Sequence, residues 1–212
     1  MATTTLVEFG ILINANKCPK DTKISFCYNY PMTLKITYFV HSKTEDNENH
    51  QSSGWNDVKL SDLGIELAKT LGEQTASMTF NAVFTSDLSR TIDTARLAWG
   101  DKYPTFADSR LRECNYGDLN GKDSSIVEPL QEKSIDTPMP NGESYKDVES
   151  RIKDFLDFVT KEYDGKHIAI VAHKAPQLAL NVLIAGMTWQ EAFDKDWRKT
   201  KSWQPGWEYI IR

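Results

Sequence analysis

Short apolar runs bounded by polar residues recur along the chain and predict its β-strands. A weaker strand-like start stands at about 105, at the head of a loop rich in Gly, Asn and Asp that ends near 121. The next segment, 122–142, contains three prolines and no clean period, which predicts a loop-rich stretch. The clearest strand candidates are rich in β-branched and aromatic residues and cover 35–40, 80–86, 167–172 and 207–211.

Helices are predicted between these strands, where apolar residues recur at intervals of three and four. Ser61 is suited to cap the first of them, which carries Leu63, Leu67 and Leu71 on one side. The predicted helices cover about 61–74, 86–99, 144–159, 175–185 and 188–198.

Two further helix starts carry capping residues. Ser86 or Asp87 is expected to cap the helix that reaches Trp99. Asp147 follows Ser144 by three residues, which is the spacing of a capping box, so a strong helix should begin there.

Strands alternate with helices throughout, and this order predicts the fold class. We expect an α/β domain, a three-layer α/β/α sandwich with a mostly parallel central sheet. No internal repeat and no linker divides 32–212, so this range should form one domain. Residues 1–31 lack a clear period from Asn14 onward and end just before Met32, which suggests an N-terminal extension that is disordered or outside the domain.

The composition and net charge of the chain limit the kinds of partner that it is expected to bind. Apolar residues make up 40% and charged residues 26% of the chain, and the net charge is −5, so no basic surface for nucleic acid or an acidic membrane is expected. Cys18, Cys27 and Cys114 form no C-x-x-C pair, which is typical of reduced thiols and predicts a cytoplasmic protein. No apolar run approaches the roughly 20 residues that span a bilayer.

Residues capable of phosphate chemistry stand just beyond three predicted strands. His41 follows the first strand, Arg90 lies one turn into the helix after the second, and His173 follows the third. Ligands bind open α/β sheets beyond the carboxyl ends of the strands, so these side chains should meet in one pocket. Two imidazoles and a guanidinium suit a doubly charged oxyanion. Taken singly, each residue is more often structural, and the pattern alone leaves both interpretations open.

Six segments in a fixed order carry a family resemblance from about 35 to 211. They are VHSKTEDN, SSGWNDVKLSDLG, FTSDLSRTIDTA, RLRECNYGDLNG, NGESYKDVESRI and IAIVAH. In this order and register they resemble the histidine phosphatase superfamily, which includes cofactor-dependent phosphoglycerate mutases and many phosphatases. The resemblance is more specific for the fold than for the reaction.

The resemblance implies a role for each matching residue. His41 would be the nucleophile that forms a phosphohistidine, and His173 and Arg90 would hold the transferring phosphoryl oxygens. Glu113 would protonate the leaving oxygen and then help to deprotonate water, which calls for a raised carboxyl pKa. Three further residues would bind the substrate. Asn47 would donate a hydrogen bond to its phosphate group, and Ser53 and Gly54 lie where mutases contact their substrate. No metal and no cofactor are implied.

The chain departs from the family at the nucleophile. Val40 stands where the family has the arginine of its Arg-His-Gly motif, and Ser42 replaces the glycine. The loss removes charge-assisted hydrogen bonds worth roughly 1.5–3 kcal/mol each. Lys43 and Lys174 are the candidate replacements, although either is as readily an exposed charge. A degenerate pocket that binds phosphoesters without turnover is the other interpretation.

Three functions follow from these residues. The first is a phosphomonoester hydrolase acting on a small phosphorylated substrate through phospho-His41. The second is a phosphoglycerate mutase or related phosphotransferase, and the third is a non-catalytic phosphate-binding protein, suggested by Val40. Cys114 in place of a basic residue and the arginine-poor segment 122–142 favour the hydrolase. Neither the substrate nor the oligomeric state can be read from the sequence.

The first prediction concerns the N-terminal extension. A chain that begins at Met32 should keep the melting temperature and the activity of the full chain, because the predicted domain begins there. Thermal unfolding and a phosphatase assay on both chains check this, and loss of either property would show that 1–31 belongs to the domain.

Overall fold

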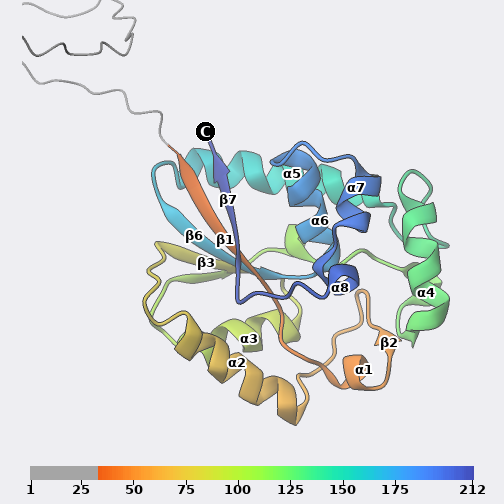
Figure 1. The fold of residues 1–212 in the computed structure, drawn as a ribbon, viewed down its shortest axis with the longest axis horizontal. Coiled ribbons are helices and arrows are strands. Elements are labelled where there is room, and N and C mark those ends of the chain that lie inside the picture. Colours follow the sequence, from red (N-terminus) through yellow and green to blue (C-terminus); the bar gives the residue numbers. More distant parts are fainter. Residues whose placement is uncertain (1–32) are drawn as a thin grey trace, which may run out of the picture. The chain divides into compact units, whose positions relative to one another are not determined.

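The computed structural model describes residues 33–212, and the expectation for residues 1–31 lies outside this range. Its central sheet has five strands in the order β4-β3-β6-β1-β7 (Figure 1). Four strands are parallel and β7 pairs antiparallel with β1 at one edge, so the expectation of a mostly parallel sheet is confirmed. The strands are β1 (Leu34–Val40), β3 (Ala82–Thr85), β4 (Thr105–Ala107), β6 (His167–Ala172) and β7 (Trp207–Ile211).

Helices cover both faces of this sheet and complete the three layers (Figure 1). Because successive side chains of a strand point to opposite faces, Phe39 packs with the core beneath one set of helices and Tyr38 with the core beneath the other. The first set is α2 (Asp62–Gln74) and α3 (Ser89–Trp99). The second set is α5 (Tyr145–Glu162), α6 (Lys174–Leu183) and α7 (Trp189–Asp194).

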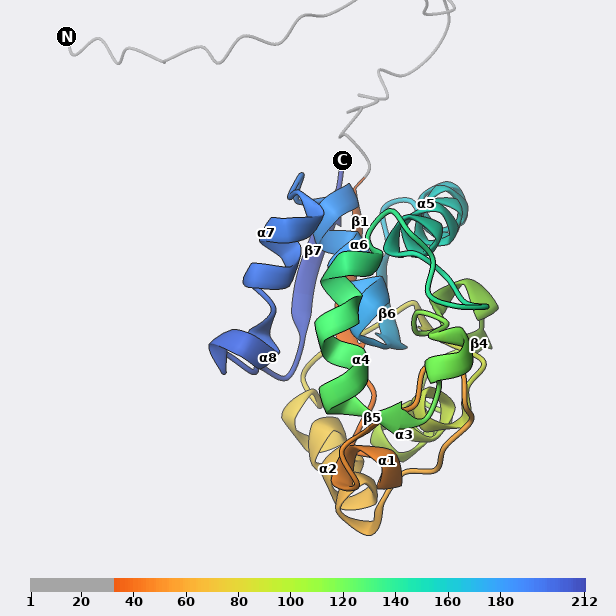
Figure 2. The same cartoon turned by 90° about the vertical axis from the view of Figure 1, so that its right-hand side faces the viewer.

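Shorter elements gather beyond the carboxyl ends of the parallel strands. The chain leaves β1 there and enters α1, and α4 stands across from it (Figure 2). Strands β2 and β5 form a separate two-stranded antiparallel sheet between them. These elements are α1 (Glu45–Glu48), β2 (Gln51–Ser52), β5 (Lys122–Asp123), α4 (Ser124–Gln131) and α8 (Trp197–Thr200), with 3-10 turns at Ser109–Leu111, Gly117–Leu119 and Glu132–Ser134.

Capping explains most helix starts that were predicted correctly. The Ser61 side chain accepts from the Gly64 N–H and begins α2. Ser144 and Asp147 form the expected capping box at α5. The helix that ends at Trp99 is present as predicted, but its predicted cap was wrong, because α3 begins after Leu88 without a side-chain cap. Ser86, the expected cap, instead bonds to groups at the end of the sheet, as described below.

The prediction that 122–142 is rich in loops holds for 135–142 and was wrong for the residues before them. This segment holds β5 and the helix α4, which Asp123 caps by accepting from the Ser125 N–H. Pro129 lies inside α4, where it removes one backbone donor, yet the helix buries Val127 and continues for two residues. The three prolines masked this helix, since only the last two lie in loop.

Two other expectations need correction. The predicted helix at 188–198 is divided into α7 and α8. In α2, Leu63 and Leu67 are about half exposed, at 50% and 47%, while Gly64 and Ala68 form the buried face. A small buried face lets α2 approach the segment that follows β1.

The second prediction tests this approach. A Cβ at Gly64 would overlap the main-chain oxygen of Lys43, two residues after His41. Gly64→Ala should therefore destabilise the fold by about 1–3 kcal/mol and lower any activity that depends on His41. Glu66→Ala, at an exposed position of the same helix, is the matched control. A Gly64→Ala variant that melts like wild type would contradict the close packing.

Candidate active site

A cavity of about 620 Å³ opens at the carboxyl ends of the parallel strands. Eight of the nine residues that the sequence predicted for the site line this cavity. The ninth, His173, is completely buried behind it. The rings of His173 and His41 lie 5.0 Å apart between centroids. The eight that line the cavity are His41, Lys43, Asn47, Ser53, Gly54, Arg90, Glu113 and Lys174.

One hydrogen bond fixes the tautomer of His41. Its Nδ1 lies 2.7 Å from the main-chain oxygen of Ser42, and a carbonyl oxygen can only accept, so Nδ1 carries the proton. Nε2 is then left with its lone pair, which is the form that a nucleophile needs.

Ser42 holds this loop on two sides. Its N–H donates to the Thr94 hydroxyl of α3 at 2.9 Å, and its own hydroxyl donates to the Gly64 carbonyl of α2 at 2.7 Å. These two bonds anchor the backbone that presents His41.

His173 has a different kind of partner. Its Nε2 lies 2.8 Å from the Ser86 hydroxyl, which can donate or accept and so allows either tautomer. Nδ1 is buried and bonds to no group in the described part of the chain. The Tyr38 hydroxyl donates to the His173 carbonyl at 2.6 Å and holds the backbone. The Ser86 hydroxyl is thus a hydrogen-bond partner of His173 and does not cap a helix.

The charged forms of both imidazoles are disfavoured. Burial first, and then the positive charges of Arg90 and Arg198, lower the pKa of His41 to about 3. Burial and the Arg90 charge also hold the pKa of His173 well below its usual value. Both rings are therefore neutral at physiological pH, and a bound anion would offset the positive charges around them.

Arg90 is a buried guanidinium without a carboxylate partner among residues 33–212. Its side chain is 1% exposed, and its two terminal nitrogens donate to the carbonyls of Gly54 and Asn56 at 2.7 and 2.8 Å. Nε has no partner within the same range, and burial lowers the pKa of the group. These bonds aim the guanidinium at the cavity and leave its charge uncompensated by any described acid at contact distance.

Glu113 lies at the N-terminus of α6. One carboxylate oxygen accepts from the N–H groups of Cys114 and Ala175, at 2.8 and 2.9 Å, and the other accepts from the Lys174 N–H at 3.1 Å. Three backbone donors orient the group, and Oε2, with one of them, keeps room for a further hydrogen bond. The structure thus ties Glu113 to the helix that begins directly after His173.

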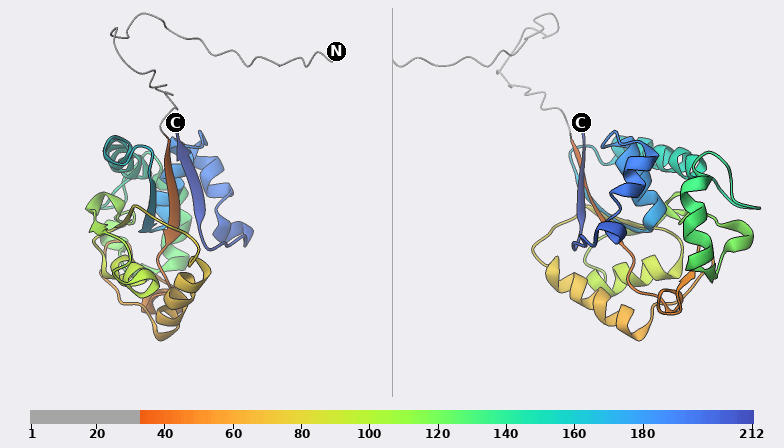
Figure 3. Two further views of the ribbon diagram at one scale, coloured as in Figure 1. Left: turned by 90° about the vertical axis from the view of Figure 1, so that its left-hand side faces the viewer. Right: turned by 45° about the vertical axis from the view of Figure 1, so that its right-hand side comes forward.

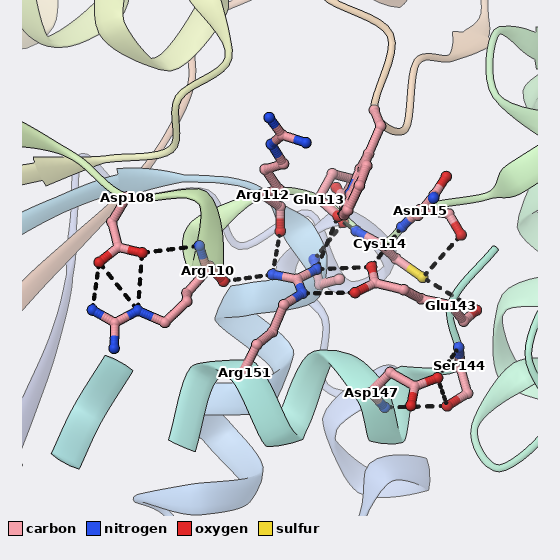
Figure 4. Close-up of polar contacts among 12 residues, drawn as sticks. Asp108, Arg110, Arg112, Glu113, Cys114, Asn115, Glu143, Ser144, Asp147 and Arg151 are labelled. Carbon is pink, nitrogen blue, oxygen red and sulfur yellow. Dashed lines mark hydrogen bonds and ion pairs between the residues drawn. The ribbon is translucent and has the colours of Figure 1, made fainter. Parts of the chain in front are cut away.

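Arg151 of α5 holds the backbone around Glu113, a role that the sequence did not reveal. Its guanidinium donates to the carbonyls of Arg110, Arg112 and Glu113 and pairs with Glu143 at 2.9 Å (Figure 4). The Trp55 indole donates to the same Glu113 carbonyl at 2.7 Å. Together these bonds fix the loop on which Glu113 stands.

The predicted substrate contacts differ in how far their side chains are committed. Asn47 uses its oxygen to accept from the Thr44 N–H, and its amide nitrogen bonds to no group within 33–212. Lys43 lies 3.8 Å from Glu48. Lys174 donates to Gln131 at 2.9 Å and lies 3.4 Å from Asp196. Their roles in binding phosphate stay predictions.

The structure adds cavity residues that sequence reasoning missed. Helix α4 forms one wall through Ser124, Glu128 and Gln131. Arg198 of α8 also lines the cavity, although it lies 157 residues along the chain from His41. No motif marked it, since only the packing of α8 places it there. The opposite, more apolar wall includes Leu67, Leu71, Trp203 and Pro205.

The described residues show neither a metal cluster nor a membrane span. No group of three or more His, Cys, Asp or Glu within 33–212 is placed to hold a metal ion, and no helix there is long and apolar enough to cross a bilayer.

The fold and the site define an α/β protein with paired histidines at the carboxyl edge of its sheet. The family description "Histidine phosphatase superfamily (branch 1)" matches residues 38–204. The chain therefore belongs to the histidine phosphatase superfamily, a family of enzymes.

Known relatives include both mutases and phosphatases. A 2,3-bisphosphoglycerate-dependent phosphoglycerate mutase of Methylobacterium sp. (strain 4-46) is 30% identical over 164 residues, which cover 70% of this chain and 79% of that one. The YhfR protein of Bacillus stearothermophilus matches with a TM-score of 0.68 and 24% identity over 76% of this chain and 84% of the other. The α-ribazole phosphatase of Shigella flexneri matches at 0.66 and 25%, over 77% and 84%.

The third prediction uses the lowered pKa of His41. An unfolded histidine takes up a proton near pH 6.5, whereas folded His41 does so only near pH 3, so wild type should lose stability as the pH falls through this window. His41→Gln removes that loss. Between about pH 7.5 and pH 5, the free energy of unfolding should fall by about 2 kcal/mol more in wild type than in the variant, as measured by urea titration. Parallel pH profiles would contradict the assignment.

Proposed function

We propose that the protein is a phosphomonoester hydrolase that acts through a phosphohistidine on His41. The observation that carries this proposal is the buried Arg90, which has no described carboxylate partner and lines the cavity together with the neutral His41, whose ring lies 5.0 Å from that of the buried His173. A phosphate group offers the negative charge and the multiple acceptors that this arrangement lacks.

In the first step, His41 displaces the alcohol. Its Nε2 lone pair forms a bond to phosphorus while the bond from phosphorus to the leaving oxygen breaks. Arg90 and His173 hold the equatorial oxygens, and Glu113 passes a proton to the leaving oxygen through Oε2. The products are the alcohol, phospho-His41 and an ionised Glu113.

In the second step, water replaces the histidine. Glu113 takes a proton from water as the water oxygen bonds to phosphorus and the N–P bond breaks. Phosphate leaves, the lone pair returns to Nε2, and Glu113 regains its proton. One carboxyl group serves both steps, so its position matters in each of them. The three backbone N–H groups that bind Glu113 keep it in that position.

The cavity wall formed by α4 favours hydrolysis over phosphoglycerate mutase activity. A phosphoglycerate has a carboxylate besides its phosphate, and a bisphosphate primer has a second phosphate, so a mutase pocket needs cations at both ends. Here α4 contributes Ser124, Glu128 and Gln131, one of them acidic. The curated relatives named as mutases keep that activity as the alternative.

The fourth prediction tests the nucleophile. His41→Ala should abolish hydrolysis of p-nitrophenyl phosphate and the covalent label that is trapped by alkaline denaturation after mixing with a ³²P-labelled phosphoester, because His41 forms the proposed N–P bond, which is stable in alkali. His50→Ala, which removes an exposed imidazole outside the cavity, is the matched control.

Each alternative has its own outcome in the same assays. Stimulation of phosphoglycerate interconversion by bisphosphoglycerate would establish a mutase instead. Binding of orthovanadate without turnover on a broad phosphoester panel would establish the non-catalytic function. Undiminished turnover by His41→Ala would contradict the proposed mechanism.

The cytoplasmic location of the protein stays a prediction.

A further inference from the structure

Val40 leaves an apolar position where the family motif has a cation. Side chains of β1 alternate between faces, so Val40 lies on the same face as Tyr38 and packs against the core beneath α5, α6 and α7. It is partly buried and lines the cavity directly before His41. Any side chain that replaces the missing arginine has to reach the cavity from this face of the sheet or from the opposite wall of the cavity.

Helix α8 lies on that face and is anchored to it. Trp207 of β7 pairs with Tyr38 of β1, and residues directly opposite in a sheet point to the same side. The Trp197 ring stacks on Trp207, with centroids 5.6 Å apart and planes at 26°. The Trp197 indole also donates to Gln177 of α6 at 3.2 Å. The strand pair next to Val40 therefore sets the position of α8 (Figures 1 and 3).

Arg198 follows Trp197 and is held in place by two neighbours. Its Nη1 donates to Asp196 at 2.9 Å, and the Asp196 side chain is only 1% exposed. Its guanidinium lies 4.4 Å from the centroid of the Trp197 ring. No group among residues 33–212 accepts from Nε or Nη2, so two edges of the fork are uncommitted while the side chain lines the cavity.

We propose that Arg198 provides the guanidinium that the strand end lacks and donates to the phosphoryl group on the side opposite Arg90. The proposal rests on the hydrolase function above and names a further phosphate-binding residue for it. The loss at position 40 is then compensated from the C-terminal part of the chain.

The two lysines predicted from the sequence fit this role less well. Lys43 is drawn toward Glu48, and Lys174 already donates to Gln131 and faces Asp196. Each offers a point charge, whereas the missing group was a planar fork that binds two phosphate oxygens together. Arg198 restores the fork. The charge of Arg198 also contributes to the lowered pKa values of both histidines, which agrees with its placement near them.

The fifth prediction measures phosphate affinity directly. Arg198→Ala should weaken inhibition by orthovanadate and binding of inorganic phosphate by about 10- to 100-fold, as expected for lost charge-assisted bonds. It should raise KM for p-nitrophenyl phosphate and lower kcat/KM by a similar factor. Arg198→Gln keeps the stem over Trp197 and tests the charge if the alanine variant unfolds. Lys195→Ala removes an exposed charge just before α8 as the matched control.

A rescue from a second position on the same face of the sheet gives the sharpest test. Val40→Arg introduced into Arg198→Ala should restore most of the lost affinity, because both positions border the cavity beside His41. Wild-type affinity in Arg198→Ala and Arg198→Gln, alongside an inactive His41→Ala, would overturn the role of Arg198 and leave the hydrolase intact. If wild type neither binds phosphate nor hydrolyses any ester, both proposals fail.

Discussion

The site depends on a positive charge that the protein buries before any substrate arrives. Arg90 sits at the start of α3 with its terminal nitrogens committed to the carbonyls of Gly54 and Asn56. Those two bonds also organise the loop after β2, where Gly54 has a φ of +54° and its missing side chain makes room for Asn120. Burial of an unpaired guanidinium is costly, so the surrounding backbone has to be rigid enough to keep it there. The cavity therefore contains a positive charge that no described carboxylate contacts.

The two histidines divide their work through their hydrogen-bond partners. The Ser42 carbonyl admits one tautomer of His41 and fixes the lone pair on Nε2, as a nucleophile requires. The Ser86 hydroxyl admits both tautomers of His173, so this ring can either donate to a phosphoryl oxygen or accept from a protonated one. The two imidazoles thus differ in their hydrogen bonding, because one partner is an obligate acceptor and the other is not.

Local patterns in the sequence predicted what local physics decides. Strands β1 and β6 lie where they were expected, and so do the helix caps at Ser61 and Ser144. Each of these features depends on residues that are neighbours in the sequence. Ser86 was misplaced because its hydroxyl bonds to His173, 87 residues away, instead of capping α3. Helix α4 was missed since burial of Val127 outweighs the signal of Pro129. Motifs picked out residues that line the cavity, such as His41 and Arg90, but the position of Arg198 depends on the stacking of Trp197 on Trp207, which no local pattern encodes.

The order of strands in the sheet has a consequence for how the molecule assembles. Strand β1, the first of the described chain, pairs with β6 and β7, which lie more than 120 residues later. Both neighbours are synthesised more than 120 residues after β1, so the end of the sheet that carries His41 is completed late. Contacts of such sequence separation slow folding, because a long loop must close before they stabilise anything. Until then β1 is an apolar strand with both of its edges unpaired.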